Sequence, residues 1–249
     1  MKTTIILPIS RPTFLSRIFP ALEFMICERE NTNLITYVDG DIKLYEIARN
    51  YTETSKFNER LCIFRNKGIA NPSSIKGRRQ RISDMHNEIK GYIKNTDFIF
   101  RTEDDTLLHP STLRRLQQTY INYPHAGMVS GVQVGRSGLR YVGLWKVDNV
   151  YDTKEISSLT LSQGEQKIDA SGFYCLLTKK ENYIKHNFKP YEDILGPDFD
   201  YGIKLRQQGF DNYVNFSVNC LHLTPKEDIK VENIQTVSYE KRHYKWWQK

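Results

Sequence analysis

Residues 98–105 read Phe-Ile-Phe-Arg-Thr-Glu-Asp-Asp, an apolar run that ends in three consecutive acids. The run from residue 97 to residue 100 favours a buried strand, so Glu103, Asp104 and Asp105 should stand at its carboxyl end. Open α/β folds usually bind ligands at this edge of a parallel sheet. Clustered carboxylates repel one another unless a cation joins them, and their oxygens suit Mg²⁺ or Mn²⁺. The stretch predicts a strand that carries a metal site; a solvated acidic turn is the alternative.

Apolar patterns before this stretch indicate further strands and helices. Residues 3–9 and 33–38 each read as a buried strand, and residues 14–27 between them have apolar side chains at helical spacing. A third short strand is expected over 61–64, and a helix over about 79–93. Strands that alternate with helices in this way favour a parallel α/β sheet.

After the acids, the chain is less regular and richer in glycine. Residues 111–123 are expected to form a helix, with Ser111 as its cap, and a glycine-rich region with short strands follows. From residue 226 onwards, charges alternate with Tyr and Trp. We expect a single α/β domain over residues 1–223 and a basic, aromatic C-terminal extension over residues 224–249.

Composition narrows the class of protein. The 249 residues carry a formal charge of +7, which favours an anionic partner such as a nucleotide diphosphate, a phospholipid surface or nucleic acid. No run approaches the roughly 18 to 20 apolar residues of a membrane-spanning helix, and no charged leader precedes the first strand. We therefore expect a cytoplasmic protein without a transmembrane segment. Four widely spaced cysteines without a CxxC pair argue against zinc or redox chemistry, and we expect them to be reduced and buried.

Four segments resemble, in the right order, the inverting GT-A fold glycosyltransferases of the family 2 type. Residues 98–105 resemble that family's strand and acidic DxD motif, and residues 168–177 are similar to its small-residue turn beneath the sugar. Residues 196–210, which begin Gly-Pro-Asp-Phe-Asp, resemble the family's Gly-Glu-Asp-Trp-Asp segment and the helix after it. Residues 219–223 resemble the later strand that delivers a histidine. The resemblance spans residues 3–223 and implies a Rossmann-like, mainly parallel mixed sheet flanked by helices.

The resemblance also assigns a catalytic and a metal site. It implies that Asp105 and His222 hold Mn²⁺ or Mg²⁺ and that Asp198 is the catalytic base. Glu103 and Asp104 are then expected to contact the ribose or support the site. From the residues alone, the alternative for Asp198 is a helix cap and the alternative for His222 is a packed core residue. Pro197 stands where the family commonly has Glu, so the paired-acid form of the motif is absent.

The remaining expected site residues would bind the nucleotide sugar. Residues 7–12 look like the family's first strand and loop, and Asp39 follows a strand in the way of its base- or ribose-contacting aspartate. Arg78 and Arg81 would either meet the pyrophosphate or solvate a helix face. Asp200 is expected to favour the start of its helix through the helix dipole. The residues expected to bind the donor are Pro8, Ser10, Arg11, Asp39, Arg81, Glu103, Asp104, Ser171 and Gly172.

The activity that the resemblance implies is transfer of a hexose, with inversion, from a nucleotide-diphosphate sugar to a hydroxyl group. UDP is the default donor nucleotide, and the acceptor is a glycan, a lipid-linked glycan or a hydroxymethylated DNA base. A non-catalytic nucleic-acid-binding protein is the alternative, since it would use the basic surface. A sugar-phosphate nucleotidyltransferase is less favoured, because residues 8–14 contain no glycine. No sequence pattern indicates an oligomeric state.

Overall fold

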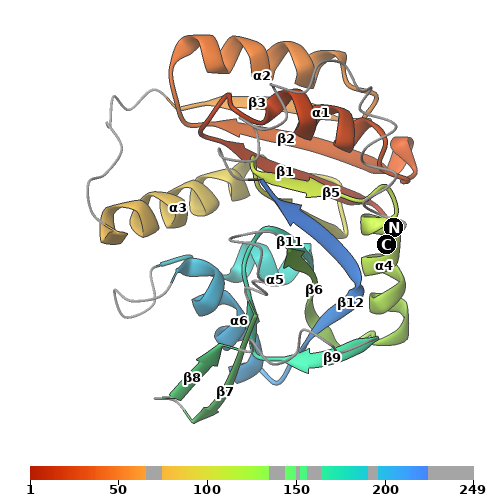
Figure 1. Cartoon of the computed structure of the whole chain (residues 1–249), viewed down its shortest axis with the longest axis vertical. Coiled ribbons are helices and arrows are strands. Elements are labelled where there is room, and N and C mark those ends of the chain that lie inside the picture. The colour runs from red at the N-terminus through yellow and green to blue at the C-terminus, as the bar shows by residue number, and fades with distance from the viewer. Residues whose placement is uncertain (66–74, 135–143, 150–151, 156–163, 190–195, 224–249) are drawn as a thin grey trace.

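A curved, mixed β-sheet forms the centre of the molecule in the computed structural model (Figure 1). The structure describes residues 1–65, 75–134, 144–149, 152–155, 164–189 and 196–223. The expected C-terminal extension over 224–249 therefore lies outside the described residues. Within them, the sheet runs in the order β3 (Arg60–Phe64), β2 (Thr32–Val38), β1 (Thr3–Ile9), β4 (Phe98–Thr102), β11 (Cys175–Lys179), β6 (Ala126–Val134), β12 (Asp211–His222) and β5 (Thr106–Leu108), and β9 (Glu165–Ile168) pairs with β12.

The pairing divides the sheet into two halves. Strands β3, β2, β1 and β4 run parallel to one another, as the alternation of strands and helices predicts. Strand β11 then runs antiparallel to both β4 and β6, whereas β12 is parallel to β6 and antiparallel to β5. The expected mixed sheet flanked by helices is confirmed. The carboxyl ends of β1, β2 and β4 consequently share one edge.

Helices cover both faces of the sheet (Figure 1). One layer contains α1 (Leu15–Glu23), α2 (Ile42–Thr54) and α4 (Thr112–Asn122), and the other contains α3 (Ile75–Ile89), α5 (Lys180–Lys185) and α6 (Pro197–Gln207). Two short 3-10 turns, η1 (Arg29–Asn31) and η2 (Lys90–Tyr92), complete the helical elements of the described residues. A small second sheet joins β10 (Ala170–Ser171), β7 (Leu144–Asn149) and β8 (Asp152–Glu155).

The alternation of side chains along β1 creates two separate apolar cores. Ile5 and Leu7 point into the core beneath α1, α2 and α4, whereas Ile6 points into the core beneath α3, α5 and α6. All three side chains are fully buried. A strand that is apolar on both faces is what a sheet covered by helices on both sides requires.

Several element boundaries differ from those that periodicity predicts. Helix α1 ends at Glu23 rather than at residue 27, because the Arg29 guanidinium donates to the carbonyls of Leu22, Glu23 and Met25 and closes the helix end. Helix α3 ends at Ile89, four residues earlier than expected, and a 3-10 turn follows.

Two local expectations are wrong. Ser111 stands before α4 but makes no capping hydrogen bond, because its hydroxyl contacts Nδ1 of His109 at 2.7 Å. The cysteines are free, but Cys27 and Cys62 are only partly buried, unlike Cys175 and Cys220. Among the described residues, no helix has the length and apolar character needed to cross a membrane.

Helix α6 lies unusually close to the small sheet at Gly202. A Cβ atom at this position would stand 2.6 Å from Cα of Ala170 and 2.7 Å from the carbonyl oxygen of Asp169. Both of these atoms belong to backbone, which cannot rotate away. Glycine is therefore required here for the approach of helix to strand.

We predict that Gly202→Ala lowers the free energy of unfolding by about 1–3 kcal/mol, because this overpacking outweighs alanine's higher helix propensity. Urea denaturation measures the change. The matched control is Gly91→Ala, where an added Cβ meets no atom within 4 Å and stability should be kept or slightly raised. An unchanged urea midpoint for Gly202→Ala would contradict the packing argument.

Candidate functional site

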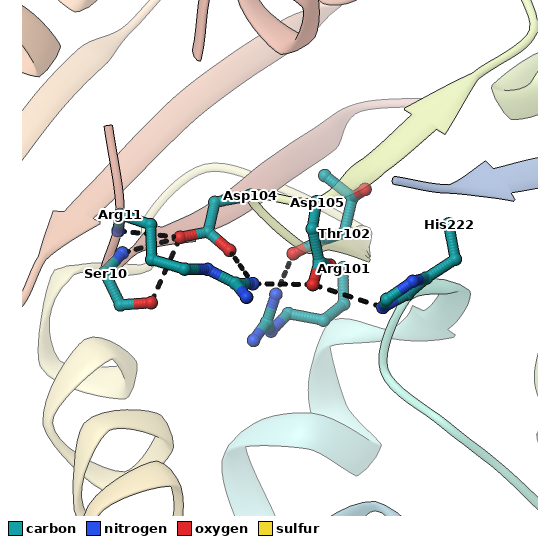
Figure 2. Close-up of polar contacts among 7 residues, drawn as sticks. All are labelled: Ser10, Arg11, Arg101, Thr102, Asp104, Asp105 and His222. Carbon is teal, nitrogen blue, oxygen red and sulfur yellow. Dashed lines mark hydrogen bonds and ion pairs between the residues drawn. The ribbon is translucent and has the colours of Figure 1, made fainter. Parts of the chain in front are cut away.

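The acidic triplet begins immediately after β4, at the shared edge of the parallel strands. Asp104 is tied to the loop after β1: its Oδ2 accepts hydrogen bonds from the Ser10 amide at 2.7 Å, the Ser10 hydroxyl at 3.1 Å and the Arg11 amide at 3.1 Å (Figure 2). The side chain is almost fully buried. Asp104 therefore holds the first loop against the end of β4.

Asp105 lies between two nitrogen-containing side chains (Figure 2). Its Oδ2 is 2.5 Å from Nη2 of Arg11 and 3.1 Å from Nε2 of His222. His222 reaches this place because β12 pairs antiparallel with β5, with His222 opposite Thr106, and the Leu223 amide donates to the Asp105 carbonyl at 2.7 Å. Residues that are far apart in sequence are thus joined at one carboxylate.

Each member of this pair keeps one buried polar atom without a hydrogen-bond partner among the described residues. These atoms are Oδ1 of Asp105 and Nδ1 of His222. Buried polar groups normally have partners, and the Asp105 oxygen, which belongs to a carboxylate already in contact with Arg11 and His222, has capacity for a further ligand. One carboxylate and one imidazole are donors that suit Mn²⁺. The described residues contain no group of three or more His, Cys, Asp or Glu side chains arranged to hold a metal, so further ligands would come from substrate or water.

The two outer acids of the triplet have opposite pKa shifts. Burial raises the pKa of Asp105, but the hydrogen bond from His222 and the charges of His222 and Arg11 outweigh it and bring the pKa below its usual range. For Glu103, burial and repulsion by Asp105 raise the pKa to about 7. Near neutral pH, Asp105 is therefore ionised, whereas Glu103 is divided between its two protonation states.

A buried arginine beneath the acids was not anticipated as a site residue. Arg101 is 3% exposed, donates through Nη1 to the Thr102 carbonyl, and lies 5.9 Å from the centre of the Phe173 ring. Its charge acts on both Glu103 and Asp198. The sequence does contain a signal for Arg101, because a lone arginine follows the apolar residues of the strand. The strand pattern does not show that the charge of this arginine acts on the acids that follow it.

Asp198 is the second residue of α6, behind Gly196 at the N-cap position and Pro197 in the first turn. Gly196 rather than Asp198 is thus the cap. Burial raises the pKa of Asp198 despite the opposing effect of a hydrogen bond from the Phe199 amide. Asp200, two residues on, lies in the first turn as expected, but it is buried and stands 3.1 Å from Nε2 of His186.

The Ser171–Gly172 turn lies beside Asp198. A Cβ atom on Gly172 would be 2.7 Å from the Tyr174 ring and 3.6 Å from Oδ2 of Asp198. Ser171 is fully buried, and its hydroxyl donates to the Gly172 carbonyl at 3.2 Å. Because glycine has no Cβ atom, position 172 leaves room for the Tyr174 ring. It also lets a ligand come close to the backbone of the turn.

Two more of the expected donor-binding residues contact each other. Asp39 follows β2, and its carboxylate is paired with Nε of Arg81 on α3, whose Nη2 also donates to the Asp39 carbonyl at 3.2 Å. Pro8 is half-buried in β1, opposite Tyr37 in the neighbouring strand. The structure thus groups Ser10, Arg11, Asp104, Asp105 and His222 at one centre, Ser171, Gly172 and Asp198 at a second, and Asp39 with Arg81 at a third.

Comparisons with known proteins define the class of fold. No family model matches the sequence, and no curated protein matches it. Among solved structures, the chain is similar to mannosyltransferase PcManGT from Pyrobaculum calidifontis in complex with GDP-Man and Mn²⁺, with a TM-score of 0.59 and 14% identity over 90% of this chain and 57% of that one. The chain has the GT-A fold that the resemblance implied.

Two structures of S. aureus TarS are also similar. One has a TM-score of 0.55 and 11% identity, and the match covers 96% of this chain and 41% of TarS. The other, TarS 1-349 in complex with UDP-GlcNAc, has a TM-score of 0.54 and 10% identity over 92% of this chain and 61% of that one. This chain therefore corresponds to only part of the length of these neighbours and of PcManGT.

We predict that Arg101→Met raises the pKa of Glu103 above its value of about 7, because the Arg101 charge favours the ionised carboxylate. A ¹³C NMR titration of the glutamate side-chain carboxyl carbons measures the shift, with Glu103→Gln to assign the signal. Arg49→Met, which removes a half-exposed arginine on α2, is the control and should leave this titration unchanged. A Glu103 pKa that stays constant or falls in Arg101→Met would refute the electrostatic role.

Proposed function

We propose that the protein is a metal-dependent glycosyltransferase that transfers a sugar from a nucleotide-diphosphate sugar to an acceptor hydroxyl with inversion. The observation that supports this most strongly is the contact between Asp105 and His222 at the edge of a GT-A sheet, where one buried oxygen of Asp105 has no partner among the residues that the structure describes. Asp105 and His222 would hold the cation. A divalent ion at this place supplies positive charge that stabilises the departing diphosphate.

Asp198 fits the role of general base. The acceptor hydroxyl must lose its proton as its oxygen attacks the anomeric carbon, and the Asp198 carboxylate takes that proton. Its raised pKa makes it a stronger base than an exposed aspartate. A single displacement of this kind inverts the anomeric configuration. Gly172, next to the Asp198 carboxylate, would let the sugar approach the turn.

The other expected residues would position the donor. Asp39 would contact the base or ribose, and its ion pair with Arg81 fixes the direction of its carboxylate. Asp104 supports the site by holding Ser10 and Arg11 in place, since both of its oxygens are already hydrogen-bonded. PcManGT binds GDP-Man with Mn²⁺ and TarS binds UDP-GlcNAc, so both nucleotides are reasonable donors to test first.

Donor binding is the first test of this function. We expect one of the UDP-, GDP-, CDP- or dTDP-sugars to raise the melting temperature of the protein, and only when Mn²⁺ is present, because ligand binding to the folded state stabilises it. Nucleotide release reports turnover in the same samples. Asp105→Ala and His222→Ala should both lose the metal-dependent shift. The absence of a metal-dependent response to every donor would exclude the proposed function.

We predict a separation of catalysis from binding at Asp198. Asp198→Asn should lower kcat/KM by about 10²- to 10⁴-fold, the usual contribution of a general base, while metal-dependent donor binding is retained. In the wild type, activity should fall as the pH drops through the raised pKa of Asp198, because only the ionised form accepts a proton. Asp211→Asn removes a surface carboxylate that pairs with Lys167 and serves as the control. Full activity of Asp198→Asn would exclude this residue as the base.

A further inference from the structure

The Arg11 side chain lies between two buried carboxylates that face the same space (Figure 2). A single nitrogen, Nη2, is 2.9 Å from Oδ1 of Asp104 and 2.5 Å from Oδ2 of Asp105. The arginine side chain is 46% exposed, whereas those of the two acids are 6% and 5% exposed. Arg11 thus reaches from the surface and neutralises an acidic pair that burial would otherwise penalise.

The two acids are held very differently. Asp104 accepts from the Ser10 amide and hydroxyl and from the Arg11 amide as well as from the guanidinium, so it remains satisfied without the arginine side chain. Asp105 shares Oδ2 between Arg11 and His222, and its Oδ1 has no partner among the described residues. Asp104 is therefore the fixed anchor of the loop, and Asp105 is the acid with capacity for another ligand.

A divalent cation on Asp105 would compete with the guanidinium. Such a cation binds carboxylate oxygen at about 2.0–2.1 Å in the case of Mg²⁺, and Arg11 Nη2 already lies 2.5 Å from the same carboxylate. A cation and a guanidinium that contact the same buried carboxylate are close together and repel each other strongly. Binding of the cation therefore favours departure of the Arg11 guanidinium from Asp105, while the backbone amide of Arg11 can stay on Asp104.

The displaced Arg11 guanidinium can bind the phosphate groups of the donor. Asp105 and His222 supply only two ligands, so the cation would take others from a diphosphate, which brings phosphate oxygens close to Arg11. Arginine binds phosphate through paired, charge-assisted hydrogen bonds. Building on the proposed function, we propose that Arg11 is an exchangeable counter-ion, which neutralises Asp105 in the free protein and moves to the donor diphosphate when cation and nucleotide bind together.

This exchange predicts positive coupling between the two ligands. A cation alone displaces Arg11 without offering it a new partner, so it should bind weakly. A nucleoside diphosphate gives Arg11 that partner and should tighten cation binding, and the effect must be reciprocal. A coupling of about 5- to 150-fold is typical of such linked sites.

The test is a titration of Mn²⁺ followed by electron paramagnetic resonance, without nucleotide and with UDP or GDP. We expect Arg11→Ala to bind Mn²⁺ alone about tenfold more tightly than the wild type, and nucleotide to tighten Mn²⁺ binding by a smaller factor in the variant than in the wild type. With saturating Mn²⁺, the same variant should bind the nucleotide more weakly. These opposite effects on two ligands distinguish exchange from a merely structural role, which would weaken both.

Three controls locate the effect. Arg49→Ala removes an arginine of similar exposure on α2 and should leave Mn²⁺ affinity unchanged. Adding His222→Ala to Arg11→Ala should abolish the tightened binding, which would place the cation at the Asp105–His222 pair. Arg11→Gln removes the charge but keeps hydrogen-bond donors, so it should reproduce the result if Arg11→Ala does not fold.

The outcomes separate this inference from the proposed function. If the wild type binds Mn²⁺ in the presence of nucleotide and the Arg11 variants bind Mn²⁺ alone no more tightly than it does, the exchange is wrong and the transferase proposal stands. If no variant binds Mn²⁺ under any condition, both fail. Tighter Mn²⁺ binding together with weaker nucleotide binding in the Arg11 variants supports the exchange.

Discussion

Repulsion between two adjacent buried carboxylates is the constraint around which this molecule is arranged. Asp104 and Asp105 stand side by side at the end of β4, where little water can screen them. Backbone amides and a guanidinium from the loop after β1 reach them from one direction, and a histidine at the end of β12 reaches Asp105 from another. The ends of three strands are thus fixed relative to one another because each supplies part of the compensation.

The topology of the sheet makes this convergence feasible. The parallel strands bring the ends of β1 and β4 to one edge. The long β12 lies between β6, to which it is parallel, and β5, with which its last residues pair antiparallel. That last contact lies directly after the acids. Apolar cores on both faces hold the strands in register. This apolar packing therefore fixes the positions of the polar side chains at the strand ends, although those polar side chains are not part of either core.

Much of the fold was predictable from local patterns, and much of the site was not. Strands β1, β2 and β3 follow apolar runs to within one residue. For β1 and β2 the reason is that a run buried on both faces has a clear signature. Helix α2 was not predicted, because its buried face shows only Leu44, Ala48 and Thr52 among many polar residues. The acids, the histidine and Asp198 could be named from their motifs. The pairing of Asp39 with Arg81, the place of Arg11 and the role of Arg101 depend on tertiary contacts that no periodicity encodes.

The contact of α6 with β10 has a mechanical consequence. At Gly202 the helix backbone and the strand backbone touch with no side chain between them, so neither can slide without the other. Asp198 begins that helix, and the Ser171–Gly172 turn ends that strand. Asp198, which we propose as the base, and the Ser171–Gly172 turn therefore move together as one rigid unit.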